Sequence, residues 1–339
     1  MTIFFHGGIT VSNNNFIHEY GKYTMDKFEF ENGKTLQNVD VEYLIKGNPK
    51  YDEFGNITNV LVFCHGYQGS FLSINELHQF TDEGQPFDFN DFLIVSIASL
   101  GFPESCCPSS SGLYQDFPEY TFKDKVNFKK QFIKEKLAIE KMRGVFGVGM
   151  GGHEVYTWAC EYPDDMEFII VGNSSYKTAG YRYIMVRGIK SVIESNPNFA
   201  LGSYDESLSN TMIAVYQLIF STYFSQKLLQ KMSNDEIDVF MESFTEKSFS
   251  IDVYDLKFQY DALIGFDLTD QLSNIKAKTL AVSPKDDLYF SYEFDVLPLT
   301  KLIDDCQIEF IDIKRNKYDE MDFSQAMEVF YSFVEEFTN

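Results

Sequence analysis

Apolar and polar positions alternate with two different periods along the chain, and the two periods predict different elements. Residues 26–33 and 36–47 alternate apolar and polar side chains on either side of the turn-forming "NGKT", which predicts an antiparallel hairpin. Continuous apolar runs of strand length follow, and such runs are typical of strands buried on both faces of a sheet. These runs cover 59–66, 91–101, 144–149, 166–175, 277–284 and 306–313.

Segments between these runs carry apolar residues at helical spacing. Residues 121–139 begin at Thr121, a residue type that caps helices, and 151–162 follow directly on one of the apolar runs. Two more helices are expected near 291–304 and 323–337. Strands that alternate with helices predict an α/β fold with a mostly parallel central sheet covered by helices on both faces.

One long block, residues 177–272, has a helical pattern throughout. Its longest apolar segment is 212–232, and 233–244 follows with a Ser or Asn cap. No Pro- or Gly-rich linker separates the block from its surroundings, so it resembles an insertion rather than a tethered domain. We therefore expect a core of residues 1–176 and 273–339 with an inserted helical cap of residues 177–272.

Composition narrows the classes of partner and location. The 339 residues are 44% apolar, which favours a folded chain, and the formal charge is −23, which disfavours nucleic-acid and membrane-surface binding. The five cysteines form no C-x-x-C pair, so no zinc or redox motif is expected. The N-terminus lacks the basic region of a signal peptide, and no apolar run approaches the roughly 18 residues of a membrane span. We expect a cytoplasmic protein without cofactor or metal.

The glycine-dense segment "GVGMGG", residues 147–152, allows three interpretations. It is the G-x-S-x-G turn of a hydrolase with Gly149 in the serine place, a dinucleotide-binding loop of the G-x-G-x-x-G type, or only a tight turn. A dinucleotide-binding site of this type has an acidic residue roughly 20 positions further along, at the end of the next strand. That strand ends in "IIVGNSS" without a carboxylate, and the motif follows the fifth strand instead of the first, so the dinucleotide interpretation is disfavoured.

Five stretches in order along the chain carry a family resemblance. They are "FENGKTLQNVDVEYLIKGN", "VFCHGYQGS", "PSSSGLYQDFPEYTFKDKV", "GVGMGGHEVYTWACEYPD" and "RGIKSVIESNPNFALGSY". From about residue 27 to its C-terminus the chain resembles the homoserine O-acetyltransferase family. The resemblance implies an α/β-hydrolase fold with an inserted helical cap. It also implies acyl transfer from acetyl-CoA to a hydroxyl group through a Ser-His-Asp triad.

The resemblance places the triad on residues that cannot all perform its chemistry. The nucleophile position falls on Gly149, the acid position on Asp287 with Asp286 as the neighbouring option, and the histidine position on Tyr318. Glycine has no attacking group, and a phenol with a pKa near 10 is a poor base at neutral pH. The oxyanion donors are backbone N–H groups, those of Tyr67 and Met150, and survive such substitutions.

Four further side chains flank the implied site. His65 belongs to an "HG" motif that shapes the loop, and His153 lies one turn beyond Gly149. Cys106 and Cys107 are adjacent in a loop that faces the family's site, and a buried or incidental role is the alternative for each. The family's cap arginines have no counterpart in the segment 207–224, so we expect substrate recognition to have changed as well.

Three functions follow from these expectations. The first is a catalytically degenerate family member that binds a small ligand in the former active-site pocket, or a protein partner. The alternative is an active acyltransferase or esterase that uses other residues. The third is a structural or assembly role. We expect a homodimer formed through the cap, because a monomer would leave part of the long apolar helix exposed to solvent.

Overall fold

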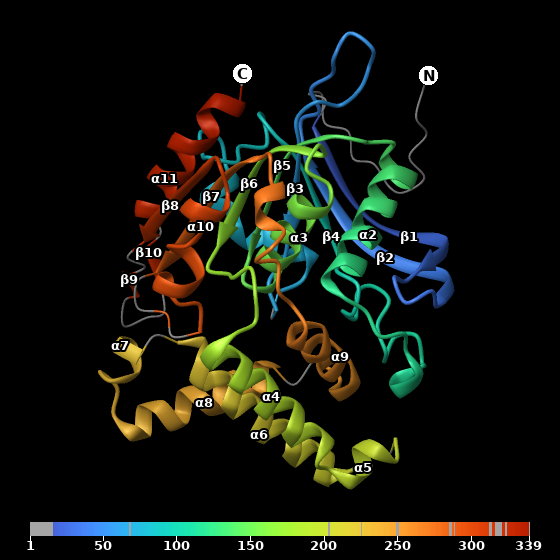
Figure 1. Ribbon diagram of the computed structural model, residues 1–339, viewed down its shortest axis with the longest axis vertical. Coiled ribbons are helices and arrows are strands. Elements are labelled where there is room, and N and C mark those ends of the chain that lie inside the picture. Colours follow the sequence, from blue (N-terminus) through green and yellow to red (C-terminus); the bar gives the residue numbers. More distant parts are fainter. Residues whose placement is uncertain are drawn as a thin grey trace.

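The protein is built around one eight-stranded sheet (Figure 1). The structure, a computed structural model, describes residues 16–338 except 68, 203, 225, 249–250, 285–286, 288, 312–313, 316–320 and 323. The strands of this sheet are, in chain order, β1 (Ile17–Glu29), β2 (Thr35–Gly47), β3 (Val60–Cys64), β4 (Leu93–Ile97), β5 (Met142–Val148), β6 (Met166–Gly172), β7 (Lys278–Pro284) and β8 (Cys306–Ile311).

The strand order across the sheet is β1-β2-β4-β3-β5-β6-β7-β8. The pairs β1–β2 and β2–β4 are antiparallel, and every other neighbouring pair is parallel. The hairpin expected from the alternating pattern is therefore confirmed, although β1 begins nine residues before the predicted start at Asp26. A short second pair, β9 (Lys314–Arg315) and β10 (Met321–Asp322), follows β8.

Helices connect the strands and fill the segment between β6 and β7. In chain order they are α1 (His78–Thr81), α2 (Phe122–Phe132), α3 (Met150–Glu161), α4 (Gly180–Glu194), α5 (Pro197–Ala200), α6 (Glu206–Tyr223), α7 (Gln226–Leu229), α8 (Asn234–Ser248), α9 (Val253–Ile264), α10 (Leu299–Leu302) and α11 (Ser324–Val334). No helix in the described part of the chain is long and apolar enough to cross a bilayer.

Both faces of the sheet are covered, and β6 shows how. Side chains three positions apart on a strand point to opposite faces. Phe168 contacts the rings of Phe333 and Phe337 at the C-terminal end of α11 and beyond it. Val171, on the other face, lies so close to Gly152 of α3 that a side chain there would touch it. The expected mostly parallel sheet, with helices on both faces, is confirmed.

The segment between β6 and β7 is helical, as the pattern indicates, but one predicted helix is wrong. The segment 212–232 is not continuous, because α6 ends at Tyr223 and Phe224 is extended. The break brings the ring of Phe224 to 4.4 Å from that of Phe240 on α8. In Figure 1, α4, α5, α6, α7 and α8 lie together beyond one end of the sheet strands. The division into core and cap domains stays a prediction.

Two other helices depart from their predicted ranges. The helix that begins at the Thr121 cap ends at Phe132 and continues as one π-helical turn, Ile133–Leu137. The helix expected near 291–304 is broken into a π-helical turn, Tyr292–Val296, and α10. Pro298 lies between these two pieces, and proline cannot donate the backbone bond that a continuous helix needs.

Candidate functional site

The turn from β5 into α3 is the centre of the candidate site. Gly149 caps α3 with φ +58° and ψ −119°, and its N–H donates to the carbonyl oxygen of Gly172 at 3.0 Å. A positive φ of this kind favours glycine, because a Cβ is strained there. The backbone therefore makes a sharp strand-to-helix turn of the nucleophile-elbow type, with Gly149 at its tip.

Open space lies beside Gly149, in contrast to its neighbour Gly151. A Cβ on Gly151 would lie 2.0 Å from the carbonyl oxygen of Cys64, so α3 approaches β3 too closely for any side chain. A Cβ on Gly149 would meet no atom within 4 Å among the described residues. The backbone conformation is therefore the constraint at Gly149, and lack of space is not.

The structure describes both residues whose backbone N–H groups are expected to be oxyanion donors, Met150 and Tyr67. Met150 is the first residue of α3, and first-turn N–H groups have no partner within their own helix. The Gly66 carbonyl oxygen accepts from the Gly69 N–H and from Nδ1 of His65, both at 3.1 Å. In a planar trans peptide the Tyr67 N–H points away from that carbonyl. His65 therefore fixes the direction of the Tyr67 donor.

His65 itself is not a base in this structure. Its side chain is buried, its Nε2 accepts from the Ser99 N–H at 3.1 Å, and burial lowers the pKa of the imidazole to about 3. Because Nε2 accepts, Nδ1 carries the proton that is donated to Gly66. The loop-shaping role of the "HG" histidine agrees with these contacts.

Asp287, the acid position, lies at the end of β7 and is held by three N–H groups. Its Oδ1 accepts from the backbone of Tyr289 and Phe290, both at 2.8 Å, and its Oδ2 accepts from the side-chain amide of Asn173 at 3.0 Å. Asn173 follows Gly172, the residue bonded to the elbow. The structure thus brings Gly149 and Asp287 to the same strand end, whereas Asp286 and Tyr318 lie outside the described residues.

A buried ion pair holds the loop that carries Asp287. The sequence analysis did not predict this pair. Arg182 in the first turn of α4 donates from both terminal nitrogens to Asp295, at 2.8 and 3.0 Å. It also donates to the Tyr289 carbonyl oxygen at 2.5 Å and to Ser175 Oγ at 2.7 Å. Arg182 and Asp295 are both at least nine-tenths buried. The pair ties the Asp287 loop to the segment after β6.

His153 supports the elbow from behind. Its Nδ1 lies 3.0 Å from the Gly149 carbonyl oxygen and 2.9 Å from Ser174 Oγ. Its ring stacks on Phe266 at 4.7 Å and is buried, and burial lowers its pKa to about 3. Phe122, Phe266 and Phe290 surround the ring, and the role of His153 as a residue that flanks the pocket stays a prediction.

The two cysteines are buried in their loop. Burial raises the pKa of Cys106 to about 12 and that of Cys107 to about 11, so neither is a ready thiolate. Cys107 Sγ contacts Ser109 Oγ at 3.3 Å, and that hydroxyl donates to Asp255 of α9 at 2.5 Å. These contacts give the loop a structural role, which was the alternative to a reactive one.

Sequence reasoning missed a buried charged cluster beneath the elbow. Glu154 of α3 accepts from Ser99 Oγ at 2.5 Å and pairs with Lys129 of α2 at 3.1 Å. Lys125, one turn earlier on α2, donates to the Leu100 carbonyl oxygen at 2.6 Å, and burial lowers its pKa to about 8. The cluster ties α2, α3 and the end of β4 together. The i, i+4 spacing of the two lysines was the available signal, but such charges are usually solvated.

Tyrosine side chains come together at the loop that follows β3 and contains Tyr67. The rings of Tyr67 and Tyr260, a residue of α9, meet edge to face at 6.2 Å. Tyr289, from the Asp287 loop, and Tyr216 of α6 raise the pKa of Tyr67 further, after the larger effect of burial. The pKa of each of these four phenols is raised, so all four stay neutral in the physiological range. The surface that they form is aromatic and polar and carries no charge.

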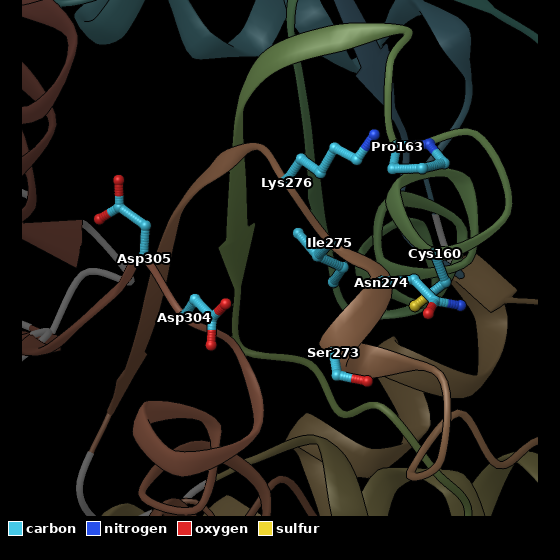
Figure 2. Close-up of a pocket in the computed structure, with 8 residues that line it drawn as sticks. All are labelled: Cys160, Pro163, Ser273, Asn274, Ile275, Lys276, Asp304 and Asp305. Atoms are coloured by element: carbon cyan, nitrogen blue, oxygen red, sulfur yellow. The ribbon is translucent and has the colours of Figure 1, made fainter.

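A separate hollow of about 600 Å³ lies on the opposite edge of the sheet (Figure 2). It is bounded by the residues that precede β6, β7 and β8, hence by the amino ends of those strands: Cys160, Pro163, Ser273, Asn274, Ile275, Lys276, Asp304 and Asp305. The elbow lies at the carboxyl end of β5, so this hollow is no part of the candidate site. Among the described residues, no three His, Cys, Asp or Glu side chains gather as a metal site.

Known proteins are similar to this chain in fold and in sequence. A homoserine O-acetyltransferase from Bacillus anthracis superposes with a TM-score of 0.78 at 20% identity, over 95% of this chain and 98% of that one. This similarity confirms the α/β-hydrolase fold. A homoserine O-succinyltransferase from Hydrogenovibrio crunogenus is 24% identical over 331 residues, with 84% of this chain and 85% of that protein covered.

A third protein is more similar in sequence. A "probable acyltransferase" from Methanothermobacter thermautotrophicus is 33% identical over 315 residues, which cover 92% of this chain and 96% of that protein. No protein-family model matches the chain. Identity of this level over nearly the whole of both chains shows common descent, and the chain belongs to the homoserine O-acetyltransferase-like family of the α/β-hydrolase superfamily.

Proposed function

We propose that this protein binds an acyl ester or thioester at the elbow and forms no acyl-enzyme at position 149. The single observation that carries the proposal is Gly149, which keeps a positive-φ elbow backbone and offers no nucleophile. The family supports the acyl class of ligand, because relatives are named acyltransferases and acylate homoserine by name.

The groups that remain at the elbow are suited to binding an acyl carbonyl. The Met150 N–H belongs to the first turn of α3 and has no partner within that helix, and the Tyr67 N–H points away from the Gly66 carbonyl oxygen. Paired backbone donors of this kind bind a carbonyl oxygen or an oxyanion. Asp287 accepts a hydrogen bond from Asn173 at the end of β6. The histidine that this acid would orient in an active relative is replaced, by position, by Tyr318. The small-ligand prediction therefore becomes an acyl-compound prediction.

Turnover is the second candidate, and the names of the relatives favour it over binding alone. An acyltransferase or esterase without a residue-149 nucleophile would have to pass the acyl group directly to its acceptor, or use a residue other than Gly149. His65, His153, Cys106 and Cys107 are all buried, so none of them is placed for this role without movement.

Two measurements on the full chain test the proposal and separate the candidates. Calorimetric titration with acetyl-CoA should give saturable binding, with free CoA and a non-hydrolysable acetyl-CoA thioether as comparison ligands. A thiol-release assay with acetyl-CoA, with and without L-homoserine, then reports turnover. Absence of saturable binding contradicts the proposal, and thiol release above the uncatalysed rate favours the second candidate.

A further inference from the structure

We infer that the place left open at Gly149 receives the hydroxyl oxygen of the acyl acceptor, a small primary alcohol or water, so that transfer is a single displacement. The inference rests on the proposed acyl site and goes beyond it. It assigns a binding function to this place, because no described atom fills the space that a serine hydroxymethyl group would occupy.

The space itself is the first argument. The Cβ direction of Gly149 meets no described atom within 4 Å, whereas the same direction at Gly151 ends on a backbone oxygen 2.0 Å away. Val148, directly before the elbow, leaves 47% of its surface exposed, which is unusual for valine at the end of an otherwise buried strand. A molecule from solvent therefore reaches the tip of the turn.

The donors give the second argument. An acyl carbonyl held by the Met150 and Tyr67 N–H groups would present its carbon to an oxygen in the nucleophile place. Met150 directly follows Gly149, and Gly66, the residue before Tyr67, lies so close to the elbow that a Cβ on it would be 3.2 Å from the Val148 carbonyl oxygen. His65 holds the carbonyl of the Gly66–Tyr67 peptide, and Gly172 holds Gly149, the residue before Met150, so the backbone beside each donor is anchored. The proximity of two bound reactants replaces the covalent intermediate.

The chemistry balances without a further reactant. The acceptor oxygen forms a bond to the carbonyl carbon, and the resulting oxyanion is stabilised by the two N–H groups. The carbon–sulfur bond of the thioester then breaks with its electron pair on sulfur. The acceptor proton passes through water to the leaving thiolate, so the products are an ester, or a carboxylic acid when water is the acceptor, and a thiol. No oxidation or reduction occurs.

Single displacement and a covalent mechanism differ in one decisive reaction. An acyl-enzyme returns its acyl group to free thiol, so acetyl-CoA exchanges label with added labelled CoA in the absence of acceptor. A single displacement cannot do this. We therefore expect acetyl-CoA with L-homoserine or glycerol to give acetyl ester and free CoA, while acetyl-CoA with labelled CoA alone gives no exchange.

A variant pair tests the open space. Gly149→Ala places a methyl group where the acceptor oxygen would lie, and we expect turnover to fall about 10²-fold, the cost of misplacing reactants by about 1 Å, with acetyl-CoA affinity little changed. Gly55→Ala is the matched control, because Gly55 also has a positive φ with no described atom within 4 Å of its Cβ, in an exposed turn. Its turnover should equal that of the unaltered chain.

The outcomes separate this inference from the proposed function. Turnover without thiol exchange, lost in Gly149→Ala alone, supports it. Exchange without acceptor overturns it, and so does binding of acetyl-CoA without ester or acid formation, although that result leaves the proposed binding intact. Absence of acetyl-CoA binding overturns the proposed function as well. The exchange measurement uses the unaltered chain, so it decides even if Gly149→Ala does not fold.

Discussion

Gly149 and Asp287 are held by consecutive residues at the end of β6. The Gly149 N–H donates to the Gly172 carbonyl oxygen at 3.0 Å, and Asp287 accepts from the Asn173 amide at 3.0 Å. Two segments more than 130 positions apart in sequence thus share one anchor. The frame that positions a nucleophile and an acid in this fold persists here, although one of the two positions carries no side chain.

The first prediction concerns the two neighbouring glycines. Gly149→Ala should destabilise the fold by about 1–3 kcal/mol, the cost of a strained backbone conformation. Gly151→Ala should cost more or prevent folding, because its Cβ would lie 2.0 Å from the Cys64 carbonyl oxygen. Urea denaturation of both variants measures the difference. Equal stability of the two variants would show that space does not distinguish these positions.

A second prediction concerns restoration of the triad. Gly149→Ser alone should add little esterase activity, since an alcohol without a base stays protonated. Tyr318→His alone should add none, since it has no nucleophile to activate. The double variant should hydrolyse p-nitrophenyl acetate about 10²-fold faster than either single variant. A folded double variant no faster than the singles would mean that position 318 does not reach the elbow.

The third prediction is a pH dependence of stability that arises from Asp255. Burial raises the pKa of this carboxyl to about 6, above its unfolded value near 4. The folded state therefore binds the proton more tightly, so this contribution to stability is fully present below about pH 4 and is lost as pH rises through about 6. A shift of this size corresponds to roughly 2–3 kcal/mol.

Asp255→Asn should remove this dependence. The neutral amide oxygen can still accept from the Ser109 N–H, which donates to Asp255 at 2.8 Å. Thermal melts of the variant from pH 4 to pH 8 should fall less steeply than those of the unaltered chain. Asp235→Asn, a change at an exposed acid of α8, serves as the control. Parallel curves for Asp255→Asn and the unaltered chain would contradict the assignment.

The fourth prediction is a homodimer through the helices between β6 and β7. Ile184 on α4, Leu218 on α6 and Val239 on α8 expose 65%, 37% and 67% of their surfaces. Exposed apolar side chains on these helices favour an interface between two copies of the chain. Light scattering at micromolar concentration should give about twice the 39.2 kDa chain mass.

Two aspartate variants locate the interface. Val239→Asp should shift the protein toward the monomer, and Phe54→Asp, at a residue 81% exposed in the turn after β2, should leave the mass unchanged. A monomeric unaltered chain at micromolar concentration, or a dimer that Phe54→Asp disrupts instead, would count against this interface.

The sequence was sufficient for the fold and for the position of the elbow. Continuous apolar runs gave the buried strands, and Thr121 was correctly predicted as a cap, since its hydroxyl accepts from the Asp124 N–H. The break at Phe224 could not be found, because apolar spacing continues across it and only the packing of its ring on α8 favours the extended residue.

The charges near the site show the limit of sequence reasoning more clearly. Lys125, Lys129 and Glu154 are read from sequence as solvated, since isolated charges are costly to bury. Only the folded arrangement brings Lys129 to 3.1 Å from Glu154 and gives Lys125 a backbone acceptor. Arg182 and Asp295 are 113 positions apart, so their pairing also carries no local signal.

We propose that the elbow binds an acyl compound without becoming acylated. Rapid-quench intact-mass spectrometry, after incubation of the full chain with acetyl-CoA and separately with a fluorophosphonate probe, tests it most directly. We expect an unmodified mass with both reagents, alongside saturable acetyl-CoA binding. A stoichiometric acetyl or phosphonyl adduct, localised by peptide mapping to a residue lining the elbow, would contradict it.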